Sequence, residues 1–280
     1  MKLLFFGDCM FGRDNHDFTL NPFKFVSKFI KQADYIFFNL ETVISPKPLS
    51  ENLREDKTFN YQSGGEQLMT LRDMTNKPIF ASIANNHSLD YGTKGIENTR
   101  RFLRRNGFLG AKSVECERES KRKSKRICFM SASDHCGCKN PEKWAKNIWM
   151  IDHNNLESLL RKIRILKEKD NFIVFSIHWG ANYLKKKPEK MIRTGRKLVD
   201  AGVDIVFGHS AHHIPPEPIE IYRNSVIIYG LGDFINDYAV DKEYESDKAL
   251  MCMIDTVRGH VEPIKVRREF VDEFSSIPIP

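Results

Sequence analysis

Side chains of the types that bind metal ions recur directly after short apolar segments along this 280-residue sequence. The first apolar segment leads into Asp8, and later segments lead into further carboxylate, amide or imidazole groups, often beside glycine. The full set is Asp8, Asn39, Glu41, Asn85, Asn86, His87, Asp90, His178, His209, His212, His213 and Asp233. Mixed oxygen and nitrogen ligands suit Mn²⁺, Fe²⁺ or Zn²⁺ better than Ca²⁺ or Mg²⁺, which prefer oxygen alone. The chemistry predicted from this set is hydrolysis assisted by a bound divalent ion.

Each of these residues taken alone has an ordinary structural explanation. A histidine after a strand is usually a hydrogen-bonded residue of the fold, Asp8 could cap a helix, and Asn86 could hold a left-handed turn. Coincidence is a poor explanation when successive predicted strands are each followed by a carboxylate, amide or imidazole group. We therefore interpret these residues as parts of one site.

The apolar segments are short, and several are continuously apolar, which is typical of strands covered on both faces. The predicted strands are 3–6, 35–38, 79–84, 127–131, 172–177, 205–207, 226–229, 249–254 and 261–267, and the predicted helices are 23–30, 96–103, 156–166 and 191–199. From Val226 onward strands follow one another, which indicates a mixed sheet or a second sheet. Ligand sites in open α/β sheets gather at the carboxyl ends of strands, so the polar residues are expected to converge in one cleft.

The composition is that of a folded protein with a large core, with 41% hydrophobic residues, 29% charged residues and 20 phenylalanines. We expect a single domain over residues 1–280. No segment approaches the roughly 20 apolar residues that span a bilayer, and the first apolar segment is too short for a secretory signal. We therefore expect a cytoplasmic protein without a membrane segment, in which the 6 scattered cysteines are reduced thiols.

Much of the formal net charge of +7 lies in two runs, Lys121–Arg126 and Lys185–Lys187. Such runs can bind nucleic acid or another polyanion, although a solvated loop or helix is the ordinary explanation. No aromatic residues are interleaved with either run, so a platform for stacking single-stranded bases is not indicated. Nucleic acid is therefore a possible partner, but the sequence does not specifically indicate it. We expect the substrate to be anionic.

Six motifs follow one another through most of the chain. They are GDCMFGR (7–13), NLETVIS (39–45), ANNHSLDYG (84–92), SIHWGANY (176–183), DAGVDIVFGHSAHH (200–213) and IIYGLGDFINDY (227–238). In order and content they resemble those of the CapA/PgsA-like poly-γ-glutamate capsule synthesis proteins, which are related to calcineurin-like metallophosphoesterases. The resemblance implies an α/β fold of four layers, in which two mixed β-sheets pack together and are flanked by helices.

The resemblance also implies roles for the polar residues. The implied metal ligands are Asp8, Asn39, Glu41, Asn86, His178, His209 and His212. Glu41 would bridge two ions, and His87 would donate a proton to the leaving group. Arg13 is predicted to pair with a phosphate or carboxylate of the substrate, the alternative being a surface ion pair. The residues predicted to orient the ligands from behind are Asn85, Asp90, Asp233 and Asp237, the alternative for the last two being direct metal binding.

Three features depart from the phosphoesterase pattern. The first motif reads Asp8–Met10 without the usual histidine, the second reads Asn39–Glu41 in place of Gly-Asp, and the two late histidines are three residues apart. One tightly bound ion is therefore as consistent with the sequence as two. Cys9 is interpreted as a small buried thiol rather than an extra soft ligand. Cys136–Cys138 lacks the second cysteine pair of a tetrahedral zinc site.

The leading functional prediction is a metal-dependent hydrolase of the metallophosphoesterase type that acts on a phosphoester. A first alternative is a role in the synthesis, export or handling of poly-γ-glutamate, which the resemblance and the positive charge favour and the lack of an N-terminal anchor weakens. A second alternative is a metal-binding relic with a scaffolding role, which the missing histidine of the first motif favours.

Overall fold

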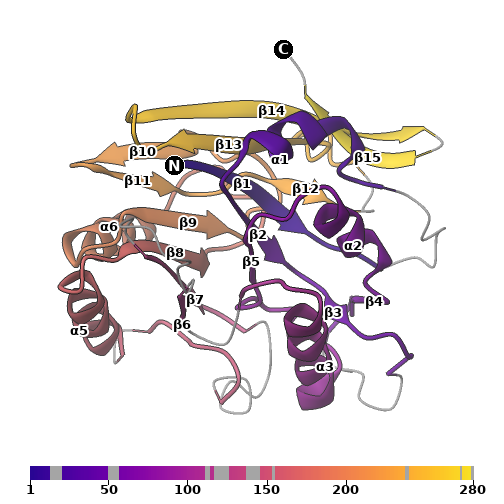
Figure 1. Ribbon diagram of the computed structural model, residues 1–280, viewed down its shortest axis with the longest axis horizontal. Helices are drawn as coiled ribbons and strands as arrows, with labels where there is room; N and C mark the ends of the chain where they lie inside the picture. The colour runs from indigo at the N-terminus through magenta and orange to yellow at the C-terminus, as the bar shows by residue number, and fades with distance from the viewer. Residues whose placement is uncertain are drawn as a thin grey trace.

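The structure of the protein, a computed structural model, has two β-sheets stacked face to face with helices on the outer sides (Figure 1). It describes residues 1–12, 21–49, 57–110, 114–116, 126–136, 146–152, 155–236, 240–271 and 273–278. No helix within these ranges has the length and the apolar character needed to cross a membrane.

The first sheet combines parallel and antiparallel strands. Its spatial order is β15 (Glu273–Pro278), β14 (His260–Val271), β13 (Lys248–Asp255), β1 (Lys2–Cys9), β2 (Tyr35–Leu40) and β5 (Ile79–Ser82), with β12 (Asp233–Ile235) paired to β1. Strands β1, β2, β5 and β12 are parallel, whereas β13, β14 and β15 are antiparallel to their neighbours. The predicted succession of strands at the C-terminal end therefore extends this first sheet.

The second sheet is also mixed. Its order is β10 (Ile219–Tyr222), β11 (Ser225–Ile228), β9 (Ile205–His209), β8 (Phe172–His178), β7 (Ile127–Ser133) and β6 (Val114–Cys116). The central strands β11, β9, β8 and β7 are parallel, and β10 and β6 pair with them in antiparallel fashion. A separate short pair consists of β3 (Val43–Ile44) and β4 (Gln62–Ser63).

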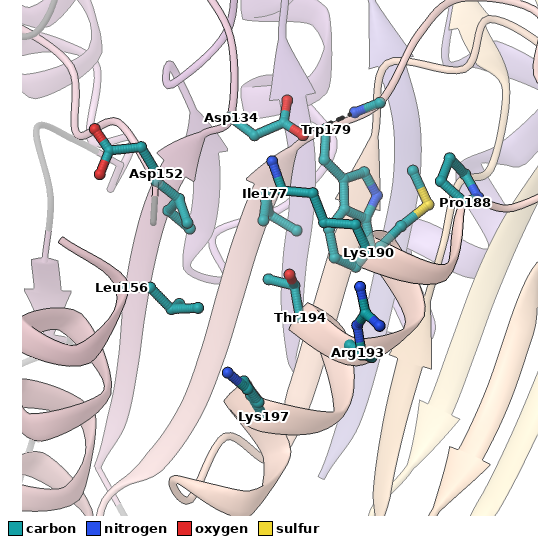
Figure 2. Close-up of a pocket in the computed structure, with 13 residues that line it drawn as sticks. Asp134, Asp152, Leu156, Ile177, Trp179, Pro188, Lys190, Arg193, Thr194 and Lys197 are labelled. Atoms are coloured by element: carbon teal, nitrogen blue, oxygen red, sulfur yellow. Dashed lines mark hydrogen bonds between the residues drawn. The ribbon is translucent and has the colours of Figure 1, made fainter. Parts of the chain in front are cut away.

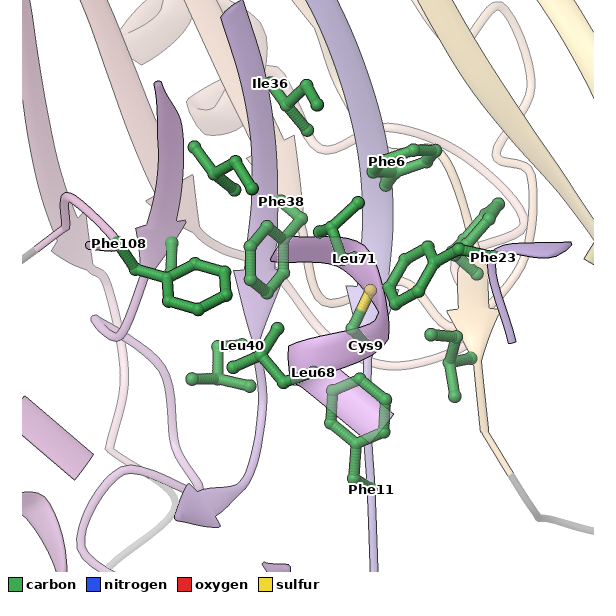
Figure 3. Packing of buried hydrophobic residues seen from close by; sticks show 14 of the residues in the cluster. Phe6, Cys9, Phe11, Phe23, Ile36, Phe38, Leu40, Leu68, Leu71 and Phe108 are labelled. Carbon is green, nitrogen blue, oxygen red and sulfur yellow. The ribbon is translucent and has the colours of Figure 1, made fainter. Parts of the chain in front are cut away.

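Helices cover the outer face of each sheet. The first sheet is covered by η1 (Lys24–Val26), α1 (Ser27–Gln32), α2 (Glu66–Asp73) and α3 (Gly92–Arg105), and the second by α5 (Leu156–Lys167) and α6 (Glu189–Asp200). At the end of β8, Ile177 and Trp179 lie in the apolar layer that α5 and α6 cover (Figure 2). On the other side, Phe38 of β2 lies in one apolar layer with Leu68 and Leu71 of α2 (Figure 3).

The two sheets meet in an apolar layer that is rich in phenylalanine. Phe37 stacks on Phe5 and Phe80 from the neighbouring strands, with ring centroids 4.7 and 4.9 Å away. From the second sheet, Phe129 lies 5.3 Å from Phe80, and Phe207 lies 5.3 Å from Phe5. Alternate residues of these strands face the helices, so both faces are buried and the segments are continuously apolar. The predicted four-layer α/β arrangement with two mixed sheets is confirmed.

Several short elements of the structure were not predicted from the sequence. Helix α2 buries only Leu68 and Leu71, too few residues to show a helical period. Strand β12 has 3 residues and is defined by its pairing with β1. Elements of this kind depend on tertiary contacts more than on their own sequence pattern.

The cysteines differ from the expectation of reduced thiols. Cys128 and Cys136 are disulfide-bonded, whereas Cys9 and Cys252 are free and buried. The prediction is therefore wrong for the first two. Cys116 lies directly opposite Cys128 in the antiparallel pair of β6 and β7, a proximity that depends on strand register and is not visible in the spacing along the chain.

Candidate metal centre

The polar strand ends lie at a common edge of the two sheets. Register places Asp8 of β1 opposite Asn39 of β2 and Asp233 of β12. In the second sheet, register places His178 of β8 beside His209 of β9. Because neighbouring parallel strands end at the same edge, residues from distant parts of the chain become close neighbours.

Two groups of buried side chains present metal-ligand atoms at close range, and they share Asp8. One group is Asp8, His178 and His209, the other is Asp8, His212 and Asp233, and within each group the ligand atoms lie within 4.8 Å of one another. Metal bonds to histidine nitrogen and carboxylate oxygen are about 2.0–2.2 Å long, so both groups have a suitable size for one ion. Asp233, predicted to orient a ligand from behind, thus lies among the candidate ligands.

Asn39 holds the two central carboxylates in place. Its amide nitrogen donates hydrogen bonds to Oδ1 of Asp8 at 2.7 Å and to Oε2 of Glu41 at 3.0 Å. Its amide oxygen accepts one from Nδ2 of Asn85 at 3.0 Å, and Asn85 also donates to the Leu40 carbonyl at 2.8 Å. Asn39 therefore donates to both carboxylates through its nitrogen, while its oxygen accepts one hydrogen bond and keeps a second lone pair, so its role as a metal ligand stays a prediction.

Three buried side-chain atoms of the predicted site residues have no hydrogen-bond partner within the described part of the chain. They are Oε1 of Glu41, Nε2 of His178 and Oδ1 of Asn86. Oε1 of Glu41 lies 3.9 Å from Nε2 of His178 and 4.0 Å from Nε2 of His87, beyond hydrogen-bond range. An unpaired buried polar atom costs about 1–3 kcal/mol, whereas one cation with bonds of about 2.1 Å can join two atoms at these separations. The residues present therefore fit a divalent transition-metal ion.

The buried carboxylates also carry an electrostatic cost that a cation would relieve. Burial, together with the neighbouring Asp233 carboxylate, raises the pKa of Asp8 to about 6. Burial and the Asp8 carboxylate raise the pKa of Glu41 well above its ordinary value. Bound divalent cations reverse such shifts because they stabilise the ionised form.

His178 and His209 form a buried pair of imidazoles. Their Nδ1 atoms are 3.0 Å apart, and Nε2 of His209 lies 2.8 Å from the hydroxyl oxygen of Ser176. Burial lowers the pKa of His209 to about 3 and that of His178 well below its ordinary value. Both rings are therefore neutral at pH 7, which is the form that binds metal ions.

Two residues next to this imidazole pair, Ser176 and His135, were not among the site residues predicted from the sequence. Ser176 precedes His178 by two positions on β8, so the alternation of side chains along a strand is a signal that could have identified it. His135 follows β7, and its ring centroid lies 5.1 Å from that of His178. Its Nδ1 lies 2.6 Å from Oδ1 of Asp134. The position of His135 after a predicted strand is the signal that the sequence offered.

His212 differs from the other buried imidazoles because it has a carboxylate partner. Burial lowers its pKa, but the Asp233 carboxylate, with Oδ1 2.9 Å from Nδ1 of the ring, outweighs burial and raises the pKa to about 10. The other oxygen of Asp233 accepts a hydrogen bond from Asn236. A cation bound by His212 would have to displace a proton, so metal binding on this side is expected to strengthen as pH rises.

His87 faces the same edge from the loop after β5. Its Nδ1 lies 2.6 Å from Oδ2 of Asp90, so the ring can donate to this carboxylate with Nε2 directed toward Glu41. The Lys57 ammonium lies 2.9 Å from the same Nδ1 and donates to Oδ1 of Asp90 at 2.8 Å. Burial lowers the pKa of His87 to about 4, so its role as a proton donor stays a prediction. Lys57 was missed because nothing in the local sequence links it to a residue so distant along the chain.

Cys9 is not placed to act as an extra ligand. Its side chain lies in the apolar layer between the first sheet and its helices, among phenylalanines and leucines (Figure 3). Successive residues of a strand point to opposite faces, so Cys9 points away from the face occupied by Asp8. The interpretation of Cys9 as a buried thiol agrees with this position.

Other predicted residues lie elsewhere or outside the described residues. Those outside are Arg13, Asp237, Cys138 and residues 121–125. Within the second basic run, Lys185 forms an ion pair with Glu243 at 2.5 Å, and Lys187 forms one with Glu217 at 3.2 Å. These two lysines are therefore engaged in local ion pairs.

Solved structures place the fold in a known class. The calcineurin-like phosphoesterase YfkN from Bacillus subtilis is similar with a TM-score of 0.50 over 99% of this chain and 88% of that chain, at 10% identity. A hypothetical protein from Thermus thermophilus is similar with a TM-score of 0.57 over 95% of this chain and 98% of that chain, at 9% identity. At these identities the likeness shows the fold alone, which is that of the calcineurin-like phosphoesterases.

Within this fold class the chain belongs to the bacterial capsule synthesis protein family PGA_cap, which matches residues 2–238. The PGA biosynthesis protein CapA of Bacillus subtilis is 30% identical over 246 residues, which cover 83% of this chain and 62% of that protein. A probable polyglutamine synthesis accessory protein of Mycobacterium tuberculosis is 29% identical over 239 residues, which cover 79% of this chain and 60% of that protein. The chain thus spans about three-fifths of the length of these relatives. The resemblance seen in the motifs is confirmed.

Proposed function

We propose that the protein is a metal-dependent hydrolase of the metallophosphoesterase type that acts on a phosphoester. The observation that carries this proposal is the pair of buried ligand groups that share Asp8. His178 and His209 would hold one ion with Asp8, and His212 and Asp233 would hold a second. Carboxylates with imidazoles favour Mn²⁺, Fe²⁺ or Zn²⁺.

The chain's own residues would orient the reacting groups. A bound divalent cation supplies Lewis acidity toward water and the scissile phosphoryl group. Asn39 keeps the carboxylates of Asp8 and Glu41 at a fixed spacing. His87 presents Nε2 to the same edge, 4.0 Å from Oε1 of Glu41, where it would transfer a proton to the leaving oxygen. The hydrogen bond from His87 to Asp90 would fix the ring for that transfer.

A second candidate is action on poly-γ-glutamate during its synthesis, export or handling. Family membership supports this candidate, as does the likeness to a relative named as a PGA biosynthesis protein. The same metal centre would serve, with an amide of an acidic polymer in place of a phosphoester. The two candidates therefore differ in substrate and share the metal site.

The test combines metal analysis of the purified protein with turnover assays in Mn²⁺. The substrates are a nitrophenyl phosphomonoester, a nitrophenyl phosphodiester and poly-γ-glutamate. We expect phosphoester turnover that falls about 100-fold or more in His178→Ala and Glu41→Gln, because each loses a metal ligand. His260→Ala, which changes an exposed histidine, should match the wild type.

Each other outcome has a definite meaning. Undiminished phosphoester turnover in His178→Ala would refute the proposed site. Cleavage of the polymer alone would replace the first candidate with the second. Stoichiometric metal without turnover of any of the three substrates would indicate a metal-binding relic with a scaffolding role.

A further inference from the structure

A cavity of about 380 Å³ lies between the start of α5, one side of α6 and the ends of β7 and β8 (Figure 2). It is separate from the candidate metal centre, because Ile177 and Trp179 face the helices while His178 between them faces the other sheet. Its floor is apolar and includes Leu156, Met191 and Pro188. Its volume falls within the range of about 300–1,000 Å³ that is typical of small-molecule sites.

One side of helix α6 turns three cationic side chains toward this cavity, namely Lys190, Arg193 and Lys197 (Figure 2). Helical residues three and four positions apart lie on one face, so these cations form a row about 10 Å long. None of the three side chains forms an ion pair or hydrogen bond with another residue in the described part of the chain. In contrast, Arg196 on the same helix pairs with Glu220 at 2.8 Å.

The acidic residues of the cavity do not neutralise this row. Asp134 accepts a hydrogen bond from the main-chain nitrogen of Gly180 at 3.2 Å and contacts Nδ1 of His135 at 2.6 Å. Asp152 accepts one from the main-chain nitrogen of Asn155 at 3.0 Å, at the start of α5. Figure 2 shows Asp152 across the cavity from the cations of α6. The α6 side therefore keeps an excess of positive charge above an apolar floor.

We propose that this cavity binds an organic anion that carries two or more carboxylates on an aliphatic chain. The row of cations provides charge partners at intervals of about 5–6 Å, and the apolar floor provides a surface for methylene groups. Trp179 is only 2% exposed, so the cavity offers no aromatic face on which a nucleic-acid base could stack. The ligand is either a free dicarboxylate or a segment of an acidic polymer, which share this chemistry.

This inference does not rest on the proposed hydrolysis, because binding in the cavity needs neither metal nor turnover. It can therefore be tested on the full chain in EDTA by isothermal titration calorimetry at low salt. The probes are glutarate, a linear trimer of γ-linked glutamate, inorganic phosphate and an oligothymidylate. Saturable binding of glutarate supports a free dicarboxylate, and binding of the trimer alone supports a polymer segment.

Variants on α6 assign the binding to the cavity. Arg193→Gln and Lys197→Gln should each weaken carboxylate binding about tenfold or more, because each removes a charge-assisted hydrogen bond. Arg196→Gln removes the same kind of charge from a position paired with Glu220 and should leave the affinity unchanged. Circular dichroism establishes that each variant is folded.

Several results would overturn the proposal. These are no binding of either carboxylate probe, equal affinity in Arg193→Gln and wild type, or equal losses in Arg193→Gln and Arg196→Gln. Phosphate or oligothymidylate that binds as tightly as the carboxylates would also overturn it, since the apolar floor would then contribute nothing to recognition.

Discussion

Replacing Glu41 with glutamine tests whether the buried charge of the centre is uncompensated without metal. Oε2 of Glu41 accepts a hydrogen bond from Asn39, and Oε1 has no partner among the described residues. Glutamine can keep the first bond and place an amide nitrogen at the second position, 3.9 Å from Nε2 of His178 and 4.0 Å from Nε2 of His87. The change removes a charge and leaves no cavity, so we expect the metal-free variant to be more stable than wild type.

The expected gain is about 1–3 kcal/mol, because glutamine removes the buried carboxylate whose pKa is raised by burial and by the Asp8 carboxylate. Each kcal/mol shifts the melting temperature of a domain of this size by about 2–4 °C, so the metal-free variant should melt about 2–12 °C higher. Mn²⁺ at about 100 times its Kd should stabilise wild type by about 2.7 kcal/mol. The variant has lost a ligand atom and should gain far less, so the difference seen in EDTA should close or reverse.

Differential scanning calorimetry in EDTA and in Mn²⁺ measures both effects. Glu262→Gln makes the same chemical change at an exposed position of β14 and should match wild type under both conditions. A lower melting temperature for Glu41→Gln in EDTA would show that the buried charge is already compensated. An undiminished gain in Mn²⁺ would show that Glu41 does not contact the ion.

Three other outcomes test the surroundings of the centre. Gly7→Ala should disrupt β1, because an added Cβ would collide with the main-chain carbonyl of Gly232 just before β12. In the control, Gly107→Ala, the added Cβ meets open space at a φ of 70°, so urea unfolding should show a loss of stability of only about 1–2 kcal/mol. Ser176→Ala should keep the fold and weaken Mn²⁺ binding about 10–100-fold by calorimetry, because His209 loses the hydroxyl 2.8 Å from Nε2 that orients it. The raised pKa of His212, about 10 against 6.5 unfolded, stabilises the metal-free protein fully below 6.5 and is lost as pH rises toward 10. Urea unfolding across that window should show the loss in wild type, and His212→Gln should show much less of it.

The sequence predicted the main strands, most of the helices and the residue types of the site because each of these depends on residues that are adjacent in the chain. A run such as Leu3–Phe6 is apolar because both of its faces are buried, and Asp8 lies near the end of the same strand, where the polar residues of the site gather. The motifs around His178 and His209 identified the family because they too are contiguous segments of the sequence. The short helix α2 was missed because few of its residues are buried.

The roles within the site required the tertiary structure. Register alone brings Asp233 opposite Asp8 and among the candidate ligands, and side-chain hydrogen bonding alone turns the amide nitrogen of Asn39 toward the carboxylates. Lys57 reaches His87 across a large separation in sequence. Apolar patterning is a local property of the chain, so the sequence by itself determined the elements and the kinds of side chain at their ends. Contacts between distant segments follow from strand pairing and packing, so only the tertiary structure decided which of those side chains lie close enough to share an ion and which ones form hydrogen bonds with them.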